Sequence, residues 1–212
     1  MPCVLGHRSR ATRLRFTRLP GKQAGKIFCQ KVIYMRIRFY FRPRPLARAA
    51  VIAALYVVLC LVLAPLSFGV VQLRFSEALT LLPVICPEAV IGVTLGCFLA
   101  NMLASSPIDM LVGTLATLLA ALLSYKWRGI RWKGLPLASA APPVIINALA
   151  IGIMLTLLFT PGAAWPVYLA NIGSVGAGQL LSCGVLGIGL VRIIEKNPSL
   201  LRFFAGNTQG PV

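Results

Sequence analysis

Four polar residues stand close together in the stretch 72–83, QLRFSEALTLLP, of a chain that is otherwise rich in apolar runs. They are Gln72, Arg74, Ser76 and Glu77. A charge at membrane depth costs from about 3 to more than about 10 kcal/mol, so charged residues in apolar runs are usually paired or bind a ligand. We therefore predict that this stretch contains ligand-contacting residues.

Arg74 and Glu77 are three residues apart, a spacing that permits two interpretations. On a helix it allows a salt bridge, which would hold the preceding loop on the helical bundle. Alternatively, Glu77 accepts two hydrogen bonds from adjacent N–H donors, such as those on a guanine-like edge, and Arg74 donates to a carbonyl or ring-nitrogen acceptor. The sequence leaves both interpretations open.

Amide side chains in later apolar runs are further candidates for ligand contact. Because an amide both donates and accepts hydrogen bonds, Asn101, Asn147 and Gln179 suit a neutral heterocycle. The alternative for each amide is a hydrogen bond between helices, worth about 0.6–2 kcal/mol.

The composition indicates which class of protein must position these side chains. Of the 212 residues, 58% are hydrophobic and only 12% are charged, and the mean hydropathy is +0.85. A soluble domain is about 25% charged, whereas several runs here approach the roughly 20 apolar residues that cross a bilayer. We predict an all-α, multi-pass membrane protein.

The net charge of +17 comes mainly from the N-terminal head, since thirteen of the 21 Lys and Arg lie in residues 1–48. Such a head attracts anionic lipid or sets orientation in the membrane, and it does not resemble a nucleic-acid-binding fold. We expect a basic, poorly ordered extension at 1–45, a membrane domain at 46–195 and a cytoplasmic tail at 196–212. A second basic lead-in begins at Met35, so the sequence leaves open whether residues 1–34 are native.

Prolines and polar loops divide the membrane domain into six segments. We predict helices at 46–64, 76–86, 88–103, 107–125, 137–159 and 167–194. Four Lys and Arg lie at 126–133, whereas none lies at 104–107 or 160–166. The positive-inside rule then places the head, the 126–133 loop and the C-terminus in the cytoplasm.

An even number of crossings must therefore separate the head from the 126–133 loop. This requires 76–86 and 88–103 to be separate passes, which gives six helices with both termini cytoplasmic. At 1.5 Å per residue the 76–86 segment is too short to span the membrane fully as an α-helix. We expect it to pack inside the bundle.

Two local patterns concern helix ends and helix packing. The run Ser106-Pro107-Ile108-Asp109 is typical of a helix start, with Ser as the cap, Pro at the first helical position and Asp closing a capping box. In the 46–64 helix, small residues recur four apart and let another helix approach closely, either within the bundle or from a partner subunit. They are Ala49, Ala50, Ala53 and Ala54.

Several kinds of chemistry lack their usual residues. The chain has no GxxxxGK[ST] motif, so it does not bind ATP through a P-loop. Its six Cys form no CxxC pair, and its single His, His7, lies outside the apolar runs. We infer no disulfide, no metal site and no Ser–His nucleophile, so a membrane enzyme is the least favoured interpretation.

The stretches VQLRFSEALTLLP, IGVTLGCFLANML and DMLVGTLATLLAALL, in this order and spacing, resemble the queuosine precursor transporter family (QueT). Members of this family are substrate-binding S components of energy-coupling factor (ECF) transporters. The resemblance covers roughly residues 46–200. It implies a six-transmembrane-helix bundle of the ECF S-component type in a prokaryotic plasma membrane.

The resemblance also implies a substrate and partners. The substrate would be a deazapurine, either a 7-deazaguanine such as preQ0 or preQ1 or else queuine, bound without a cofactor through Arg74, Glu77, Asn101, Asn147 and Gln179. A transmembrane coupling subunit would contact Ala49, Ala50, Ala53 and Ala54, and two ATPase subunits would supply the energy. The alternative is a stand-alone secondary carrier of a small heterocyclic metabolite, although the two matching halves common in such carriers are not evident.

Overall fold

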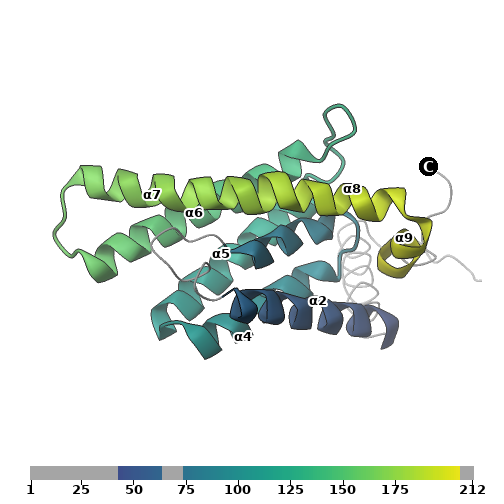
Figure 1. Ribbon diagram of the computed structural model, residues 1–212, viewed down its shortest axis with the longest axis horizontal. Coiled ribbons are helices and arrows are strands. Elements are labelled where there is room, and N and C mark those ends of the chain that lie inside the picture. Colours follow the sequence, from purple (N-terminus) through teal and green to yellow (C-terminus); the bar gives the residue numbers. More distant parts are fainter. Residues whose placement is uncertain (1–42, 64–73, 206–212) are drawn as a thin grey trace, which may run out of the picture. The chain divides into compact units, whose positions relative to one another are not determined.

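The computed structural model describes residues 43–63 and 74–205. The predictions for the basic head, for Gln72 and for the end of the tail lie outside these ranges. Within them the chain forms helices and no β-strand, with α2 and the later helices lying side by side as a bundle (Figure 1).

The described elements follow one another with short connections. They are α2 (Pro43–Val62), η1 (Phe75–Val84), α4 (Ala89–Ala104), α5 (Pro107–Lys126), α6 (Leu137–Phe159), α7 (Trp165–Gln179), η2 (Leu180–Gly187), α8 (Ile188–Lys196) and α9 (Pro198–Ala205). Of the described helices, four are long and apolar enough to cross a membrane: α2, α5, α6 and the continuous helix formed by α7, η2 and α8. The prediction of an all-α membrane protein is confirmed.

Most predicted boundaries agree with the structure, and the exceptions have physical reasons. The bounds of α6 are those predicted, and α4 and α5 differ by no more than one residue at either end. Helix α2 begins at Pro43, before the predicted position 46, because proline is tolerated in a first turn whose N–H groups have no helical partner. Within the segment assigned to the tail, residues 198–205 form the amphipathic helix α9.

The 76–86 segment differs from prediction in helix type. It is a 3-10 helix, η1, and Pro83 inside it lacks the N–H that an α-helix would use there. The Thr80 hydroxyl donates to the Glu77 carbonyl at 2.6 Å. At about 2.0 Å per residue, ten residues of 3-10 helix extend about 20 Å, compared with about 15 Å for an α-helix.

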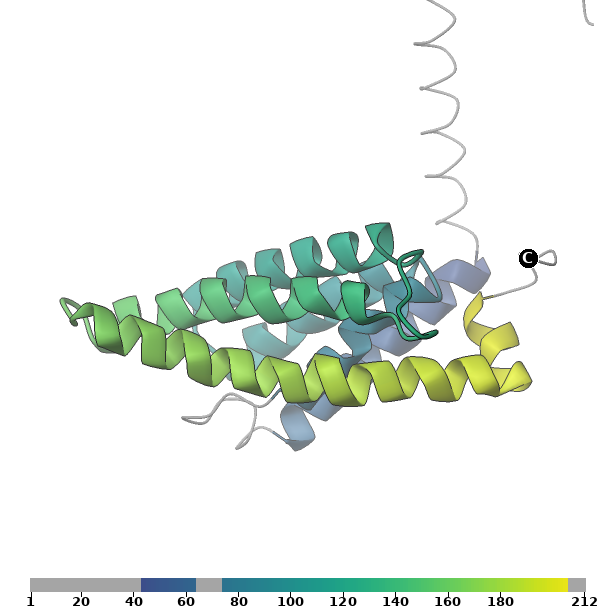
Figure 2. The same ribbon diagram turned by 90° about the horizontal axis from the view of Figure 1, so that it is seen from above.

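This 3-10 helix is the centre of the bundle. Residues 76–84 are all buried, and η1 contacts α2, α4, α5, α6, η2 and α8. Helices α2, α4, α5, α6 and α7 follow one another as packed neighbours, and Figure 2 shows this arrangement from above. The prediction that the segment packs inside the bundle is confirmed.

Small residues allow α2 and α4 to approach closely. A Cβ added at Gly96 would lie 2.6 Å from the Tyr56 Cβ, and one added at Gly92 would lie 2.8 Å from the Ala49 carbonyl oxygen. Ala49 and Ala53 are buried, and these distances place both in the contact with α4. Ala50 and Ala54 are exposed on α2.

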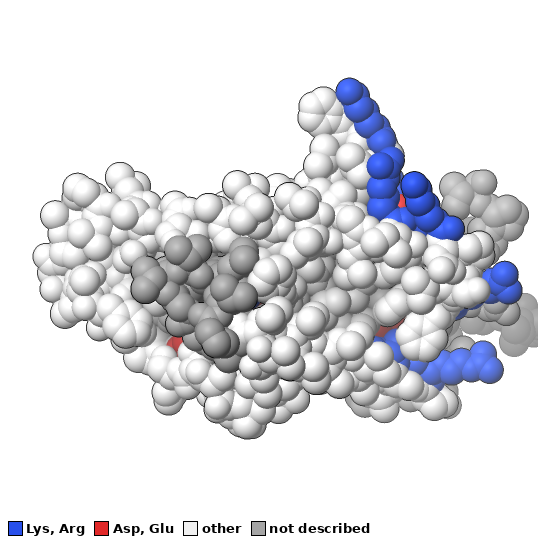
Figure 3. Space-filling model, viewed as in Figure 1, with Lys and Arg blue, Asp and Glu red and all other residues white. Residues whose placement is uncertain are grey.

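The surface of the bundle is apolar along its length and basic at one end. Large apolar side chains are exposed on every long helix, among them Leu55, Leu115, Ile145 and Leu180. On the face in Figure 3, Lys and Arg gather at one end. We call this the basic end; it comprises the start of α2, the loop 127–136, the end of α8 and α9.

Two sets of contacts join the segments of the basic end. Arg131 in the loop 127–136 pairs with Glu195 in α8 at 2.6 Å. Arg48 of α2 pairs with Glu88, which immediately precedes α4, at 2.5 Å. The same guanidinium donates to the carbonyl oxygen of Phe204 in α9 at 2.7 Å.

Candidate ligand-binding site

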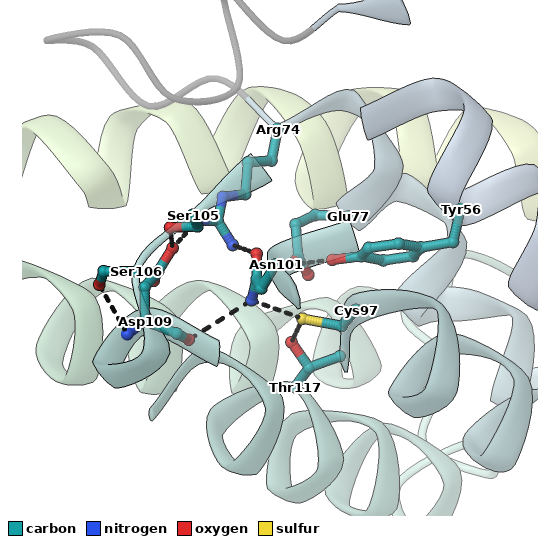
Figure 4. A network of polar contacts seen from close by, with 9 residues as sticks. All are labelled: Tyr56, Arg74, Glu77, Cys97, Asn101, Ser105, Ser106, Asp109 and Thr117. Atoms are coloured by element: carbon teal, nitrogen blue, oxygen red, sulfur yellow. Dashed lines mark hydrogen bonds and ion pairs between the residues drawn. The ribbon is translucent and has the colours of Figure 1, made fainter. Parts of the chain in front are cut away.

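Buried polar side chains form a network around η1, in the interior of the apolar bundle. Figure 4 shows part of it, with side chains from α2, η1, α4 and α5 directed toward one another. All the residues predicted from the sequence to bind a ligand are buried there: Arg74, Glu77, Asn101, Asn147 and Gln179. The structure assigns each of them specific partners.

Arg74 connects the start of η1 to the turn between α4 and α5. Its Nη2 forms a salt bridge with Oδ2 of Asp109 at 2.9 Å, and its Nη1 donates to Oδ1 of Asn101 at 3.3 Å. Ser105 also donates from its hydroxyl to Oδ2 of Asp109. The planar guanidinium therefore holds three segments of chain together through separate N–H donors.

Asp109 has two roles, of which the sequence predicted one. Its backbone N–H donates to the Ser106 hydroxyl at 3.2 Å, and Pro107 occupies the first turn, so the predicted helix cap is confirmed. Its side chain is also the acidic partner of Arg74, which sequence reasoning missed. The available signal was the scarcity of acids: the chain has four, and Asp109 is one of two that border the apolar segments around Arg74.

Glu77 lies on η1 and accepts hydrogen bonds on both carboxylate oxygens. The Tyr56 hydroxyl of α2 donates to Oε1 at 2.7 Å, and Nδ2 of Asn147 in α6 donates to Oε2 at 3.3 Å. Tyr56 was not predicted as a site residue. Its signal was a hydroxyl-bearing ring in the middle of an apolar run, since a buried Tyr O–H usually has a partner.

Gln179 joins the network through a cysteine that sequence reasoning treated as apolar. The Cys183 thiol is 3.1 Å from the Glu77 carbonyl oxygen and 3.4 Å from Oε1 of Gln179. Cys183 lies in η2, a π-helical segment that begins directly after Gln179. Such π segments occur frequently at functional sites, and here one turns Cys183 toward η1.

The orientation of Asn101 is fixed by contacts on its other side. Its Nδ2 is 3.4 Å from the Asp109 carbonyl oxygen and 3.5 Å from the Cys97 thiol, which also accepts from Thr117 at 3.3 Å. A Cβ at Gly113 would lie 2.8 Å from Nδ2 of Asn101. Glycine at this position lets the amide approach α5 and present its oxygen to Arg74.

Some buried polar atoms in this region have no hydrogen-bond partner within the described residues. They include Oδ1 of Asp109, Oδ1 of Asn147, and the hydroxyls of Ser76 and Ser182. A buried polar group without a partner costs about 1–3 kcal/mol. Such atoms in a native protein therefore mark positions where a bound molecule would be stabilised. Residues 43–63 and 74–205 hold no group of three His, Cys, Asp or Glu suited to a metal ion.

The fold and site define a class: a multi-pass membrane protein whose apolar helices enclose a network of hydrogen-bond donors and acceptors. The family model described as "QueT transporter" matches residues 46–196. The chain therefore belongs to the QueT transporter family.

One curated relative and the solved structures add to this comparison. The chain is 39% identical over 71 residues to "Queuosine precursor transporter QueT" of Lactococcus lactis subsp. cremoris (strain MG1363), which is 32% of this chain and 42% of the relative. The chain thus spans less than half the length of that relative. No solved structure gives a significant match.

Proposed function

We propose that this protein is the substrate-binding subunit of an ECF transporter. It would import a queuosine precursor, either a 7-deazaguanine such as preQ0 or preQ1 or else queuine, while partner subunits hydrolyse ATP. Family membership and the printed name of the Lactococcus relative support this proposal. The observation that carries it is the buried network of donors and acceptors inside an apolar bundle.

The proposed topology is six passes with both termini in the cytoplasm. Four long helices are supplemented by η1 and α4, which are apolar but shorter. Two contacts support counting η1 as a pass. Arg74, just before η1, bonds to the turn between α4 and α5, whereas Glu88, just after it, bonds to Arg48 at the basic end.

Recognition would use hydrogen bonds that the network already makes internally. The two oxygens of Glu77 accept from Tyr56 and Asn147, and adjacent N–H groups on a guanine-like ring would compete for the same oxygens. Arg74 would donate to the ring carbonyl, with Asn101 and Gln179 as further polar contacts. Because a ligand would also engage buried atoms that lack partners, exchange need not leave a net deficit of hydrogen bonds.

The coupling subunit would contact the outer face of α2. Of the four alanines on this helix, Ala50 and Ala54 are exposed, and their small side chains would let a partner helix approach closely. Ala49 and Ala53 are buried against α4. They would support the interface indirectly by fixing the position of α2.

A binding titration tests the proposed ligand contacts. Purified protein would be titrated with preQ0, preQ1 and queuine, and Glu77→Ala is expected to weaken the affinity by at least about tenfold, because a hydrogen bond to a charged group is worth about 1.5–3 kcal/mol. Glu195→Ala, which removes a partly exposed acid at the basic end, is the control. An unchanged affinity in Glu77→Ala would remove Glu77 from the site.

A second experiment tests the requirement for partners. Mass spectrometry of material purified in mild detergent should detect a transmembrane coupling subunit and two ATPases with the chain. Proteoliposomes that contain the chain alone should show no concentrative uptake. Uptake by the chain alone would instead favour the stand-alone carrier.

A further inference from the structure

The acids of this chain are distributed unevenly relative to their basic partners. All four acids lie in the described residues, and each of the two at the basic end pairs with one arginine: Glu88 with Arg48 and Glu195 with Arg131. The buried network contains the other two, Glu77 and Asp109, but only one basic residue, Arg74. A chain with a net charge of +17 thus places one more acid than base in its core.

The hydrogen bonds around the two buried acids fit ionised carboxylates. Asp109 accepts from the Arg74 guanidinium and from the Ser105 hydroxyl on the same oxygen. Glu77 accepts from a donor on each oxygen, Tyr56 on one and Asn147 on the other. Neither arrangement requires a proton on the carboxyl group. With Arg74 charged, the network then carries a net charge of −1.

The atoms left without partners also favour a donor-rich ligand. Oδ1 of Asp109 and Oδ1 of Asn147 are acceptors only, and both are fully buried. The two hydroxyls without partners, on Ser76 and Ser182, can donate or accept. The network therefore has spare acceptors as well as spare negative charge, a combination that a cationic N–H donor would satisfy.

We infer that the site selects a precursor carrying a protonated amine over a neutral precursor with the same ring. In chemical terms it prefers the aminomethyl group of preQ1 to the nitrile of preQ0. This inference rests on the proposed function and specifies its substrate class. A desolvated cation beside the surplus carboxylate replaces an unbalanced charge with a pair, whereas a nitrile supplies neither charge nor a donor.

The preference can be measured as a ratio of affinities. Purified full-length protein would be titrated at neutral pH with preQ1, with preQ0 and with 7-deazaguanine, which lacks a substituent at the same ring position. A primary amine is protonated under these conditions. We expect preQ1 to bind at least about tenfold more tightly than preQ0, because a buried hydrogen-bonded charge pair is worth several kcal/mol.

Charge-neutral variants locate the source of the preference. Glu77→Gln and Asp109→Asn each remove one negative charge while nearly keeping side-chain shape, and at least one should bring the preQ1 to preQ0 ratio close to one. Glu195→Gln makes the same change at the basic end and should leave the ratio as in the wild type. Because a ratio is compared, a general loss of ring binding in a variant does not imitate the expected result.

The outcomes separate this inference from the proposed function. Tight binding of all three heterocycles without preference for preQ1, or tighter binding of preQ0, would overturn the charge inference and leave the proposed function intact. A wild-type preference that persists in both Glu77→Gln and Asp109→Asn would also overturn it. If none of the three compounds binds, the proposed function fails and this inference fails with it.

Discussion

The bundle contains two buried arginine–carboxylate pairs whose surroundings differ. At the basic end, Arg48 pairs with Glu88 and donates to the carbonyl oxygens of Phe203 and Phe204 in α9. In the core, Arg74 pairs with Asp109 and donates to Asn101. A second acid, Glu77, lies in the same network as Arg74, while Glu88 is the only acid bonded to Arg48 among the described residues.

This difference separates a structural contact from a recognition site. Arg48 balances one acid and uses its remaining donors on backbone carbonyls at the end of a helix, an arrangement that ties α2 to α9. The network around Arg74 retains surplus acid and unpartnered acceptors in a buried position. The same residue types can therefore close one region of the protein and leave another able to bind a ligand.

The largest expected effect comes from removing the core arginine. Arg74→Ala leaves Asp109 and Glu77 buried without a cation, so we expect a loss of about 3–5 kcal/mol of stability and no detectable ligand binding. Arg74→Lys keeps the charge but loses the planar fork and should recover stability only in part. Thermal unfolding in detergent measures both variants. A melting temperature for Arg74→Ala equal to that of the wild type would contradict the assigned role.

The matching change at the basic end should destabilise the protein without affecting binding. Arg48→Ala leaves Glu88 buried and releases the α9 carbonyls, with an expected loss of about 2–4 kcal/mol and a ligand affinity within about twofold of wild type.

A double substitution sharpens the contrast between the two pairs. Replacing Arg48 and Glu88 together by Met and Leu should restore most of the lost stability, because an apolar pair can substitute for a buried ion pair. The corresponding replacement of Arg74 and Asp109 should abolish binding whether or not the protein folds stably. Retained ligand affinity in that second double variant would place recognition elsewhere.

A smaller effect is expected where α2 meets α4. In Gly96→Ala the new methyl group would lie 2.6 Å from the Tyr56 Cβ, so α2 must shift and the hydrogen bond from Tyr56 to Glu77 should weaken. The expected cost is about 1–3 kcal/mol, together with reduced affinity. Gly189→Ala, where no atom lies within 4 Å of the added Cβ, is the control and should be neutral or stabilising by up to about 1 kcal/mol.

The smallest effect is expected at the third ion pair. Arg131 and Glu195 are partly exposed, at 37% and 26% of their side-chain surface, so solvent screens their attraction. Glu195→Gln should change the unfolding free energy by less than about 1 kcal/mol and leave ligand affinity unaltered. A loss as large as that of Arg48→Ala would show that this pair holds the loop 127–136 more firmly than exposure suggests.

The sequence determined the class of protein and the composition of the site. Hydropathy indicated the membrane helices, since a run of about 20 apolar residues has few other stable environments. The same reasoning placed Arg74, Glu77, Asn101, Asn147 and Gln179 in the interior, because lipid contact would be too costly for them. The cap at Ser106 was readable because it depends on neighbours only three residues apart.

Only the tertiary structure decided which of these residues meet. The partners of Arg74 in α4 and α5 lie 27 and 35 residues along the chain, and those of Glu77 lie 21 and 70 residues away. Sequence spacing predicts contacts within one helix, whereas contacts between helices depend on how each helix is rotated. Helix type matters similarly: the 3-10 geometry of η1 and the π segment η2 set the positions of Glu77 and Cys183, and both arise from packing in the assembled bundle.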